Sequence, residues 1–404
     1  MSKSIIIIGA GIAGPVLAML LKHKGFDAVV YERQPELRQA GIALNVSPQT
    51  FKVLNILGLA EKLIALGSQL EEGLTYSQLL GEIIGRNEGP ARLRESLGWP
   101  LLVVSRSKYC EFLHSSARER GVEMHFSKRC VDVKQEGERV KATFEDGSEA
   151  EGDLLVGADG LHSTVRNVLF GKEPATYMGL VQVGGIGPIP EFFQPWKPTL
   201  YQSFGDGAHW LSTPINNTEM AWTATMPQPA EEREDWRRMS IEETKAMVKA
   251  VPVADWDYGV KDAVASATFV TKFGLYERPI ADVWHKGRVV LAGDAAHPTS
   301  PHLGQGANQA MEDCYHLVRV LLKATPFTDA SLEAAFTEYE SIRHPVVIKS
   351  VGTAKKQGEA RVLIGKEVCE KRDKAMKEAG GFDPERIKLQ LELVQGPFQG
   401  TSEI

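Results

Sequence analysis

Two glycine-rich segments that lie almost 300 residues apart in this 404-residue chain constrain its fold more than any other feature. The first, Ile5 to Gly14, reads IIIIGAGIAG, and the second lies within Gly287 to Leu322 and contains GDAAHPTSPHLGQGANQ. An apolar, β-branched run before such a turn predicts a buried parallel strand that leads into a helix. Backbone N–H groups at a helix start can bind anionic groups, so the two segments together predict one extended ligand.

The first segment has the pattern with which proteins bind dinucleotides. Gly9, Gly11 and Gly14 allow a tight turn, a close backbone approach to a pyrophosphate, and close packing of helix on strand. A second strand, Ala28 to Tyr31, leads to Glu32, which is placed to bind the ribose hydroxyls of an adenosine. The alternative, a turn that only packs a helix on a sheet, accounts for the glycines but not for Glu32.

The second segment predicts the other end of the ligand. A strand, Val289 to Leu291, is followed by Asp294, whose carboxylate can accept hydrogen bonds from a chain of hydroxyls. A helix with an apolar face is predicted from Gly304, and its first N–H groups can meet a partial negative charge. A dinucleotide with a ribityl chain and an anionic ring edge satisfies both features, so the sequence predicts FAD.

A third segment, Asp153 to Arg166, again places a strand before small and acidic residues and a helix start, with Ser163 or Thr164 as the predicted N-cap. In this order the three segments resemble the group A flavoprotein monooxygenases, the para-hydroxybenzoate and salicylate hydroxylase type, over about residues 4 to 350. The resemblance implies an α/β fold. It consists of a Rossmann-like FAD-binding domain, an inserted antiparallel β-sheet domain for substrate, and C-terminal helices.

The resemblance also implies which residues bind the cofactor. It places a motif shared by flavin and nicotinamide contacts on Asp159-Gly160 and an FAD-contacting arginine on Arg106, although Tyr109 stands where the family usually has leucine. Tyr339 to Pro345 is similar to the C-terminal helix signature of the family. The complete predicted cofactor site is Gly9, Gly11, Gly14, Glu32, Arg33, Ala43, Arg106, Asp159, Asp294, Gly304, Gly306 and Ala307.

The implied activity is NAD(P)H- and O2-dependent hydroxylation or epoxidation of an electron-rich aromatic or polycyclic small molecule, through a flavin hydroperoxide. The protein would place the substrate, exclude water and supply a proton. No second strand–GxGxxG–helix unit follows Glu32, so the nicotinamide is expected to bind transiently over the flavin. A flavin-dependent reductase, a halogenase of the same fold and a non-catalytic FAD-binding protein are the alternatives.

Changes in composition divide the chain into four parts. We predict an FAD-binding domain at 1–174 and 281–350, a substrate-binding sheet at 175–280 and a helical tail at 351–404. The charged tail either covers the surface or contacts a second subunit, which makes a homodimer one candidate assembly. The middle part is rich in tryptophan, with Trp196, Trp210, Trp222, Trp236 and Trp256.

Residues on the substrate side are predicted from this middle sheet and the nearby loop. The candidates are Tyr201, His209, Trp210, Trp222, Met226 and His302, and a place in the core or on the surface is the competing interpretation of each. Tyr201 and His209 are the predicted catalytic residues because both can exchange a proton with a phenol. Hydroxylases of the family that the chain resembles often have an arginine at the start of this sheet. The segment Val181 to Gly185 lacks one, so the resemblance implies an apolar aromatic or polycyclic substrate and not an anionic one.

Composition argues against several other classes of protein. With 46 basic and 52 acidic residues, the chain has no charge excess that would favour nucleic acid or an anionic membrane as a partner. Its four cysteines form no CxxC pair, and no histidine, cysteine and carboxylate cluster has the spacing of a metal site. The sequence therefore predicts a cytoplasmic protein without a metal ion.

Overall fold

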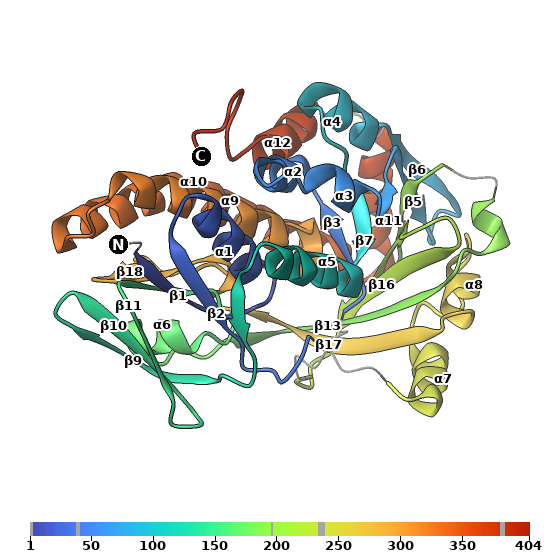
Figure 1. Cartoon of the computed structure of the whole chain (residues 1–404). Coiled ribbons are helices and arrows are strands. Elements are labelled where there is room, and N and C mark those ends of the chain that lie inside the picture. The colour runs from blue at the N-terminus through green and yellow to red at the C-terminus, as the bar shows by residue number, and fades with distance from the viewer. Residues whose placement is uncertain (1–2, 38–40, 195–196, 233–238, 380–383) are drawn as a thin grey trace.

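The computed structural model describes residues 3–37, 41–194, 197–232, 239–379 and 384–404 (Figure 1). The strands of the three glycine-rich or acidic segments lie side by side in one six-stranded sheet, as predicted. Its order is β18 (His285–Lys286), β19 (Val289–Leu291), β12 (Leu154–Gly157), β1 (Ser4–Ile8), β2 (Asp27–Tyr31) and β8 (Glu123–His125). All neighbouring pairs are parallel except β18–β19. The turns that follow β1, β12 and β19 therefore meet at one edge of the sheet.

Helices cover this sheet and bury its apolar residues. The main ones are α1 (Ala13–His23), α5 (Arg106–Glu119), α9 (Gly306–Lys323) and α10 (Asp329–Arg361). The helix predicted from Gly304 begins two residues later, at Gly306. Gly304 instead ends a short 3-10 turn, η3 (Pro301–Leu303), and its φ of +62° lies outside the helical region.

The middle of the chain forms most of a seven-stranded sheet. Its order is β17 (Phe269–Glu277), β13 (Thr176–Pro188), β16 (Glu219–Pro227), β15 (His209–Pro214), β14 (Thr199–Phe204), β5 (Glu72–Ser77) and β6 (Glu82–Asn87). The predicted antiparallel pairing holds except between β14 and β5, which are parallel. Strands β5 and β6 come from the range that we assigned to the FAD-binding domain, so the sheet does not follow the predicted boundary at 175. Strand patterning does not encode which sheet a strand joins.

The remaining elements extend and cover these two sheets. One three-stranded sheet contains β9 (Cys130–Glu136), β10 (Arg139–Phe144) and β11 (Glu149–Gly152), and another contains β3 (Ala43–Val46), β7 (Leu102–Ser105) and β4 (Ser68–Gln69). The other helices are α2 (Pro48–Ile56), α3 (Ala60–Ile64), α4 (Gly89–Leu97), α6 (Thr164–Phe170), α7 (Ile241–Ala250), α8 (Val260–Ala265), η1 (Glu191–Phe193) and η2 (Gly293–Ala295). The predicted cap of α6 is confirmed at Ser163, whose hydroxyl accepts a hydrogen bond from the Arg166 N–H.

The C-terminal tail packs on its own chain. Helix α10 crosses the predicted boundary at 351 without a break and ends at Arg361, and α11 (Lys366–Glu378) and α12 (Pro384–Val394) follow it. On α11, Asp373 accepts a hydrogen bond from Ser77 of β5 at 2.6 Å. On α12, Leu393 and Val394 are buried against Leu93 of α4. No described helix has the length and apolar character needed to cross a membrane.

The two faces of the large sheet meet different surroundings. On the outer face, Trp210 and Trp222 are buried in a cluster that includes residues from the α7–α8 region, seen beside the sheet in Figure 1. On the inner face, Phe273 and Leu275 pack with Ile42 and Val103 of the FAD-binding part. Trp196 and Trp236 lie outside the described residues.

Candidate active site

The turn between β1 and α1 leaves no room for side chains at two of its three glycines. A Cβ on Gly9, whose φ is +110°, would overlap the carbonyl of Ala158. A Cβ on Gly14 would overlap the carbonyl of Gly9. Nothing lies within 4 Å of a Cβ placed on Gly11, which is exposed. The turn is therefore tightly packed at Gly9 and Gly14 but open to solvent at Gly11, where a pyrophosphate can approach the backbone.

Glu32 is held against this turn by the backbone. One carboxylate oxygen accepts a hydrogen bond from the Ala10 N–H at 2.8 Å, and the other accepts one from the Gln34 N–H at 2.8 Å. Each oxygen has a second lone pair, so the carboxylate can still accept hydrogen bonds from ribose hydroxyls. The neighbouring Arg33 is exposed.

Asp159 lies next to the same turn and caps a second helix. Its carboxylate accepts hydrogen bonds from the Ser163 hydroxyl at 2.5 Å and from the Thr164 N–H at 2.7 Å. The start of α6 is thereby fixed beside the dinucleotide turn, because Ala158 packs against Gly9.

A buried polar network joins the start of α9 to β3 and α2. The amide of Asn308 donates to the carbonyls of Asn45 and Gly304, both at 2.9 Å. Its oxygen accepts from the Ser47 N–H at 2.9 Å and the Thr50 hydroxyl at 2.8 Å. The predicted residues Ala43 on β3 and Gly304, Gly306 and Ala307 near α9 are thus brought together on facing segments. Arg106 reaches this region too, since its side chain packs against Gly41.

Asp294 is exposed in the turn after β19, and its Oδ1 lies 3.7 Å from a Cβ placed on Gly306. A buried carboxylate, Asp313 of α9, holds this turn from behind. Asp313 accepts hydrogen bonds from the Gly293 N–H at 2.8 Å and from His297 at 2.6 Å. Its other oxygen accepts one from Arg343 of α10 at 2.7 Å.

Sequence reasoning missed the roles of Asp313, Arg343 and His297, which we call the α9–α10 clamp. Burial alone would raise the pKa of Asp313, but His297 and Arg343 hold it well below its usual range. The guanidinium also pairs with Glu312, whose pKa is raised by burial. A signal was present, because adjacent acidic residues interrupt the buried α9 helix and Arg343 lies within the Tyr339 to Pro345 signature.

These residues fit FAD. The open backbone above Gly11 suits a pyrophosphate, Glu32 suits a ribose, and Asp294 beside the α9 start suits a ribityl chain that ends at a ring. The structure therefore brings the predicted residues of the first turn, Asp159 and Asp294 to one edge of the parallel sheet, with Ala43 and Arg106 on neighbouring segments.

The two predicted catalytic residues do not lie together. In β14 and β15, Tyr201 pairs with Ser212, whereas His209 pairs with Phe204. Paired residues share a face and successive residues alternate, so Tyr201 and His209 are on opposite faces. Tyr201 packs against Phe193 in the outer cluster, with ring centroids 4.5 Å apart.

The other candidates from the middle sheet share the face of Tyr201. Trp222 pairs with Ser212 and Trp210 pairs with Ala224, and both tryptophans and Met226 belong to the outer cluster. Trp210 and Trp222, the two tryptophans that the structure describes on these strands, therefore form no wall on the inner face. An alternating strand pattern shows that two faces exist, but not which of them the cofactor domain covers.

His209 joins an inner-face polar cluster that also contains Gln202, His302 and Arg361. The Gln202 Oε1 lies 3.2 Å from His209 Nε2 and accepts a hydrogen bond from Arg361 at 3.3 Å. Arg361 also donates to the backbone carbonyl of His302 at 2.7 Å. His302 precedes Gly304 in the loop before α9, so this cluster borders the predicted ring-binding end of the cofactor site.

Both histidines of this cluster are neutral at neutral pH. Burial, followed by the charge of Arg361, lowers the pKa of His302 to about 4. Burial also lowers the pKa of His209 well below its usual value, with Arg361 and His302 adding to the effect. His302 is 4% exposed, and neither of its ring nitrogens has a hydrogen-bond partner among the described residues. Buried polar groups normally have hydrogen-bond partners, so the two ring nitrogens of His302 are suited to bind a ligand.

Comparisons with known proteins agree with this geometry. Residues 2–354 match the family described as FAD binding domain, and the chain belongs to that family. The 3-amino-4-hydroxybenzoate 2-monooxygenase of Streptomyces cremeus is 33% identical over 376 residues, which cover 92% of this chain and 91% of the relative. The 6-hydroxynicotinate 3-monooxygenase of Pseudomonas fluorescens is 28% identical over 347 residues, which cover 85% of this chain and 88% of the relative.

A solved structure is similar over almost the whole chain. Klebsiella pneumoniae HpxO, crystallised with FAD and uric acid, matches with a TM-score of 0.84 and 28% identity, covering 98% of this chain and 97% of HpxO. The predictions of the fold class, of FAD as cofactor and of a flavoprotein monooxygenase are confirmed. NAD(P)H is the reductant typical of this family.

Proposed function

We propose that this monooxygenase hydroxylates a small aromatic ring that carries an ionisable hydroxyl group, bound at His209 and His302. The observation that carries the proposal is the pair of unpartnered nitrogens on the buried His302 ring, beside the loop that leads into α9. A neutral imidazole offers one donor and one acceptor, which is the combination that a phenolic hydroxyl requires.

The residues of the site have separate tasks in this proposal. When bound, FAD supplies the redox chemistry with dioxygen and the nicotinamide. The ring nitrogens of His302 and His209 hold the substrate hydroxyl, and a nitrogen that accepts its hydrogen bond polarises the O–H bond and makes the ring richer in electrons. Gln202 and Arg361 position these histidines through the hydrogen bonds already described. The buried surroundings exclude water from the reacting atoms.

The polar groups around His209 on the inner face favour a compact, polar ring over a polycyclic apolar substrate. Gln182 and Thr225 extend the polar surface next to His209, because Gln182 donates to Thr225 at 3.1 Å and Thr225 pairs with His209. The absence of arginine from Val181 to Gly185 was the argument against an anionic substrate. Arg361, from the range assigned to the tail, supplies a guanidinium to the polar cluster instead, so that argument no longer applies. The names of two relatives, 3-amino-4-hydroxybenzoate and 6-hydroxynicotinate monooxygenase, support a hydroxylated aromatic acid as the substrate class.

Turnover with isotopically labelled dioxygen tests this function. FAD-loaded protein is supplied with NADH or NADPH and a panel of hydroxybenzoates, hydroxypyridine carboxylates, phenols and indoles. We expect faster NAD(P)H oxidation with hydroxylated monocyclic acids and a product that carries one labelled oxygen atom. Label that enters only from water, or nicotinamide oxidation that yields only hydrogen peroxide across the panel, would contradict the proposal.

The same assay separates the remaining alternatives. A reductase would consume the nicotinamide and form product without oxygen, a halogenase would require halide, and a non-catalytic protein would form no product. The charge balance still favours small molecules, and not nucleic acid or a membrane, as partners. The tail that we considered for a homodimer contact covers its own chain at α4 and β5.

A further inference from the structure

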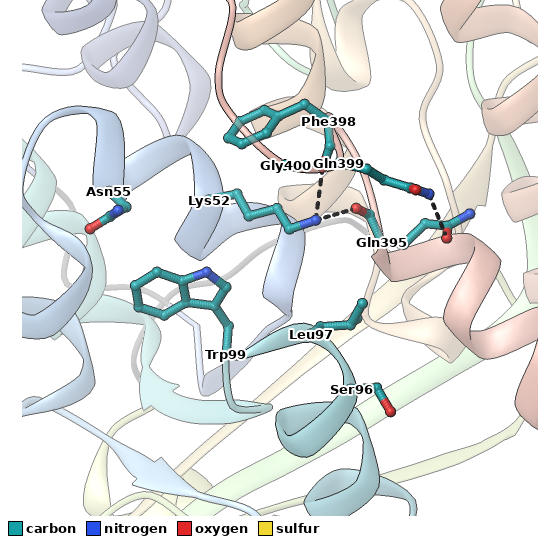
Figure 2. Close-up of a pocket in the computed structure, with 9 residues that line it drawn as sticks. All are labelled: Lys52, Asn55, Ser96, Leu97, Trp99, Gln395, Phe398, Gln399 and Gly400. Atoms are coloured by element: carbon teal, nitrogen blue, oxygen red, sulfur yellow. Dashed lines mark hydrogen bonds between the residues drawn. The ribbon is translucent and has the colours of Figure 1, made fainter.

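A surface cavity of about 490 Å³ shares no residue with the cofactor site or with the polar cluster of His209 (Figure 2). This size is within the range of small-molecule sites. Three parts of the chain that are distant in sequence line the cavity: α2, the end of α4 with the loop after it, and the segment after α12. The lining residues are Lys52, Asn55, Ser96, Leu97, Trp99, Gln395, Phe398, Gln399 and Gly400.

Two aromatic rings of the cavity are held in place from behind. Trp99 stacks on the buried Phe51, with ring centroids 5.8 Å apart and an angle of 13° between the planes. Phe398 packs against Tyr315 of α9, with centroids 5.0 Å apart. Rings fixed in this way can stack on a flat ligand without losing much side-chain freedom on binding.

Lys52 is the one ionised residue among the nine that line the cavity. Figure 2 shows its side chain extending between Trp99 and Phe398. Its ammonium group donates to the carbonyls of Gln395 at 2.6 Å and Phe398 at 2.8 Å. An ammonium group has three N–H donors, so one is left for a ligand. Burial lowers the pKa of Lys52, and Glu312, which opposes this shift, is itself paired with Arg343.

We propose that this cavity is a second ligand site, which binds a planar aromatic carboxylate. The ring stacks on Trp99, the carboxylate accepts a hydrogen bond from Lys52, and the amides of Asn55 and Gln399 complete the rim. The positive charge of Lys52 and the absence of a lining carboxylate select an anion. The aromatic walls select a flat one.

The site is connected to the cofactor end of the molecule through α2. One turn before Lys52, Gln49 donates to Gln305 at 2.8 Å and also to the carbonyl of Leu393 at 3.2 Å. Gln305 is the N-cap residue of α9, next to Gly304 and Gly306. A ligand that tightens the C-terminal segment against α2 therefore acts on the helix start that bounds the cofactor site, as an effector would.

Calorimetric titration of the FAD-loaded protein with 2-naphthoate tests the proposal. Asn55 is exposed, so Asn55→Asp adds a negative charge at the rim without disturbing the core, and Asn55→Ser is its neutral control. We expect binding to be about tenfold weaker in N55D than in N55S, because the added carboxylate repels the probe. Lys52→Met should weaken binding at least as much, and Trp99→Phe should retain it because the stacking surface remains.

A second probe and a second signal separate this cavity from the substrate site. Uncharged 2-naphthol should bind N55D and N55S equally. A probe molecule at His209 and His302 would perturb the visible flavin spectrum, which the second-site event should leave unchanged. Equal 2-naphthoate affinities in N55D and N55S, or no binding to the wild-type protein at millimolar probe, would overturn the proposal. Neither result bears on the proposed hydroxylation, because no turnover is measured.

Discussion

At the dinucleotide turn, three glycines are required for three different physical reasons. Gly9 has a backbone conformation with φ of +110° that other residues rarely adopt, and it packs against Ala158. Gly14 has an ordinary φ but packs against the carbonyl of Gly9, so its requirement comes from helix–strand packing. Gly11 meets nothing within 4 Å, so the protein itself does not require glycine there. We expect the requirement at Gly11 to come from the cofactor, because a pyrophosphate that approaches this backbone would leave no room for a side chain.

Alanine substitutions should separate these effects. Gly14→Ala should lower the free energy of unfolding by about 1–3 kcal/mol, because backbone must shift to admit the methyl group. Gly11→Ala should leave the stability of the apo-protein within about 1 kcal/mol of wild type but weaken FAD binding. Urea unfolding of apo-protein and fluorescence titration with FAD measure the two quantities. Equal FAD affinity in G11A and wild type would show that the pyrophosphate does not approach this residue.

His302 makes the stability of the protein depend on pH. Its pKa is about 4 in the folded protein and near 6.5 in the unfolded chain, so the unfolded chain binds the proton more tightly. The contribution of neutral His302 to the free energy of unfolding is therefore complete above about pH 6.5 and is lost as the pH falls towards 4. The full loss is about 3 kcal/mol for this residue.

Replacement of His302 by asparagine should therefore reduce the acid sensitivity of the protein. Between pH 7 and pH 4.5, the free energy of unfolding should fall less in H302N than in the wild type. Urea unfolding at the two pH values provides the measurement. His209 titrates in both proteins, and the substitution removes a contribution to its lowered pKa that is smaller than those of burial and Arg361. Identical losses in the two proteins would mean that His302 is not buried as a neutral group.

Among the structural elements, α10 has the most consequences for the cofactor site. Through Arg343 it holds Asp313 of α9, and Asp313 in turn fixes the Gly293–His297 turn that carries Asp294. Arg343 is completely buried, so its charge is tolerated only because Asp313 and Glu312 neutralise it. The turn that carries Asp294 is thus held through Asp313 by a buried arginine of α10.

Removal of this guanidinium should be costly. Arg343→Met should destabilise the protein by about 3–5 kcal/mol, because two buried carboxylates lose their partner. It should also lower FAD affinity, since the turn of Asp294 loses its support. Lys349, which is on α10 like Arg343, forms an exposed ion pair with Glu392 of α12. Lys349→Met is therefore the matched control and should cost at most about 1 kcal/mol. Chemical denaturation and FAD titration of both variants measure these effects, and equal losses would refute the role of the clamp.

At the scale of the whole molecule, the polar cluster of His209 exists only because three distant parts of the chain meet. The large sheet supplies His209 and Gln202, the loop before α9 supplies His302, and the end of α10 supplies Arg361. The inner face of the sheet is the one that packs against the FAD-binding part, whereas the outer face is sealed by its own apolar cluster. Substrate recognition should therefore be sensitive to substitutions on one face only.

Paired substitutions on the two faces test this arrangement. His209→Asn should lower kcat/KM about tenfold or more, because a hydrogen bond to the substrate is lost, while the flavin spectrum and FAD affinity stay unchanged. Tyr201→Phe should leave kcat/KM near the wild-type value, because the outer face does not border the site. Steady-state kinetics with the best substrate of the panel provide the comparison. The reverse pattern would place the substrate on the outer face.

The sequence by itself determined the parts of the protein that depend on local pattern. The β-branched run before Gly9, the helical spacing after it and the Ser163 cap are short-range features, and the structure has each of them where the pattern predicts. The three segments predicted FAD, because cofactor binding depends on backbone geometry that glycine and acidic residues specify locally. The monooxygenase class was implied by the resemblance of these segments to a known family.

Only the tertiary structure decided what depends on contacts between distant segments. It joined β5 to β14, placed Tyr201 and His209 on opposite faces, and brought Arg361 to His302. Strand alternation is identical for either orientation of a sheet, so the sequence could not show which face meets the cofactor domain. A buried charge such as that of Arg343 is likewise recognisable only when its partners on another helix are known, because its stability comes from them.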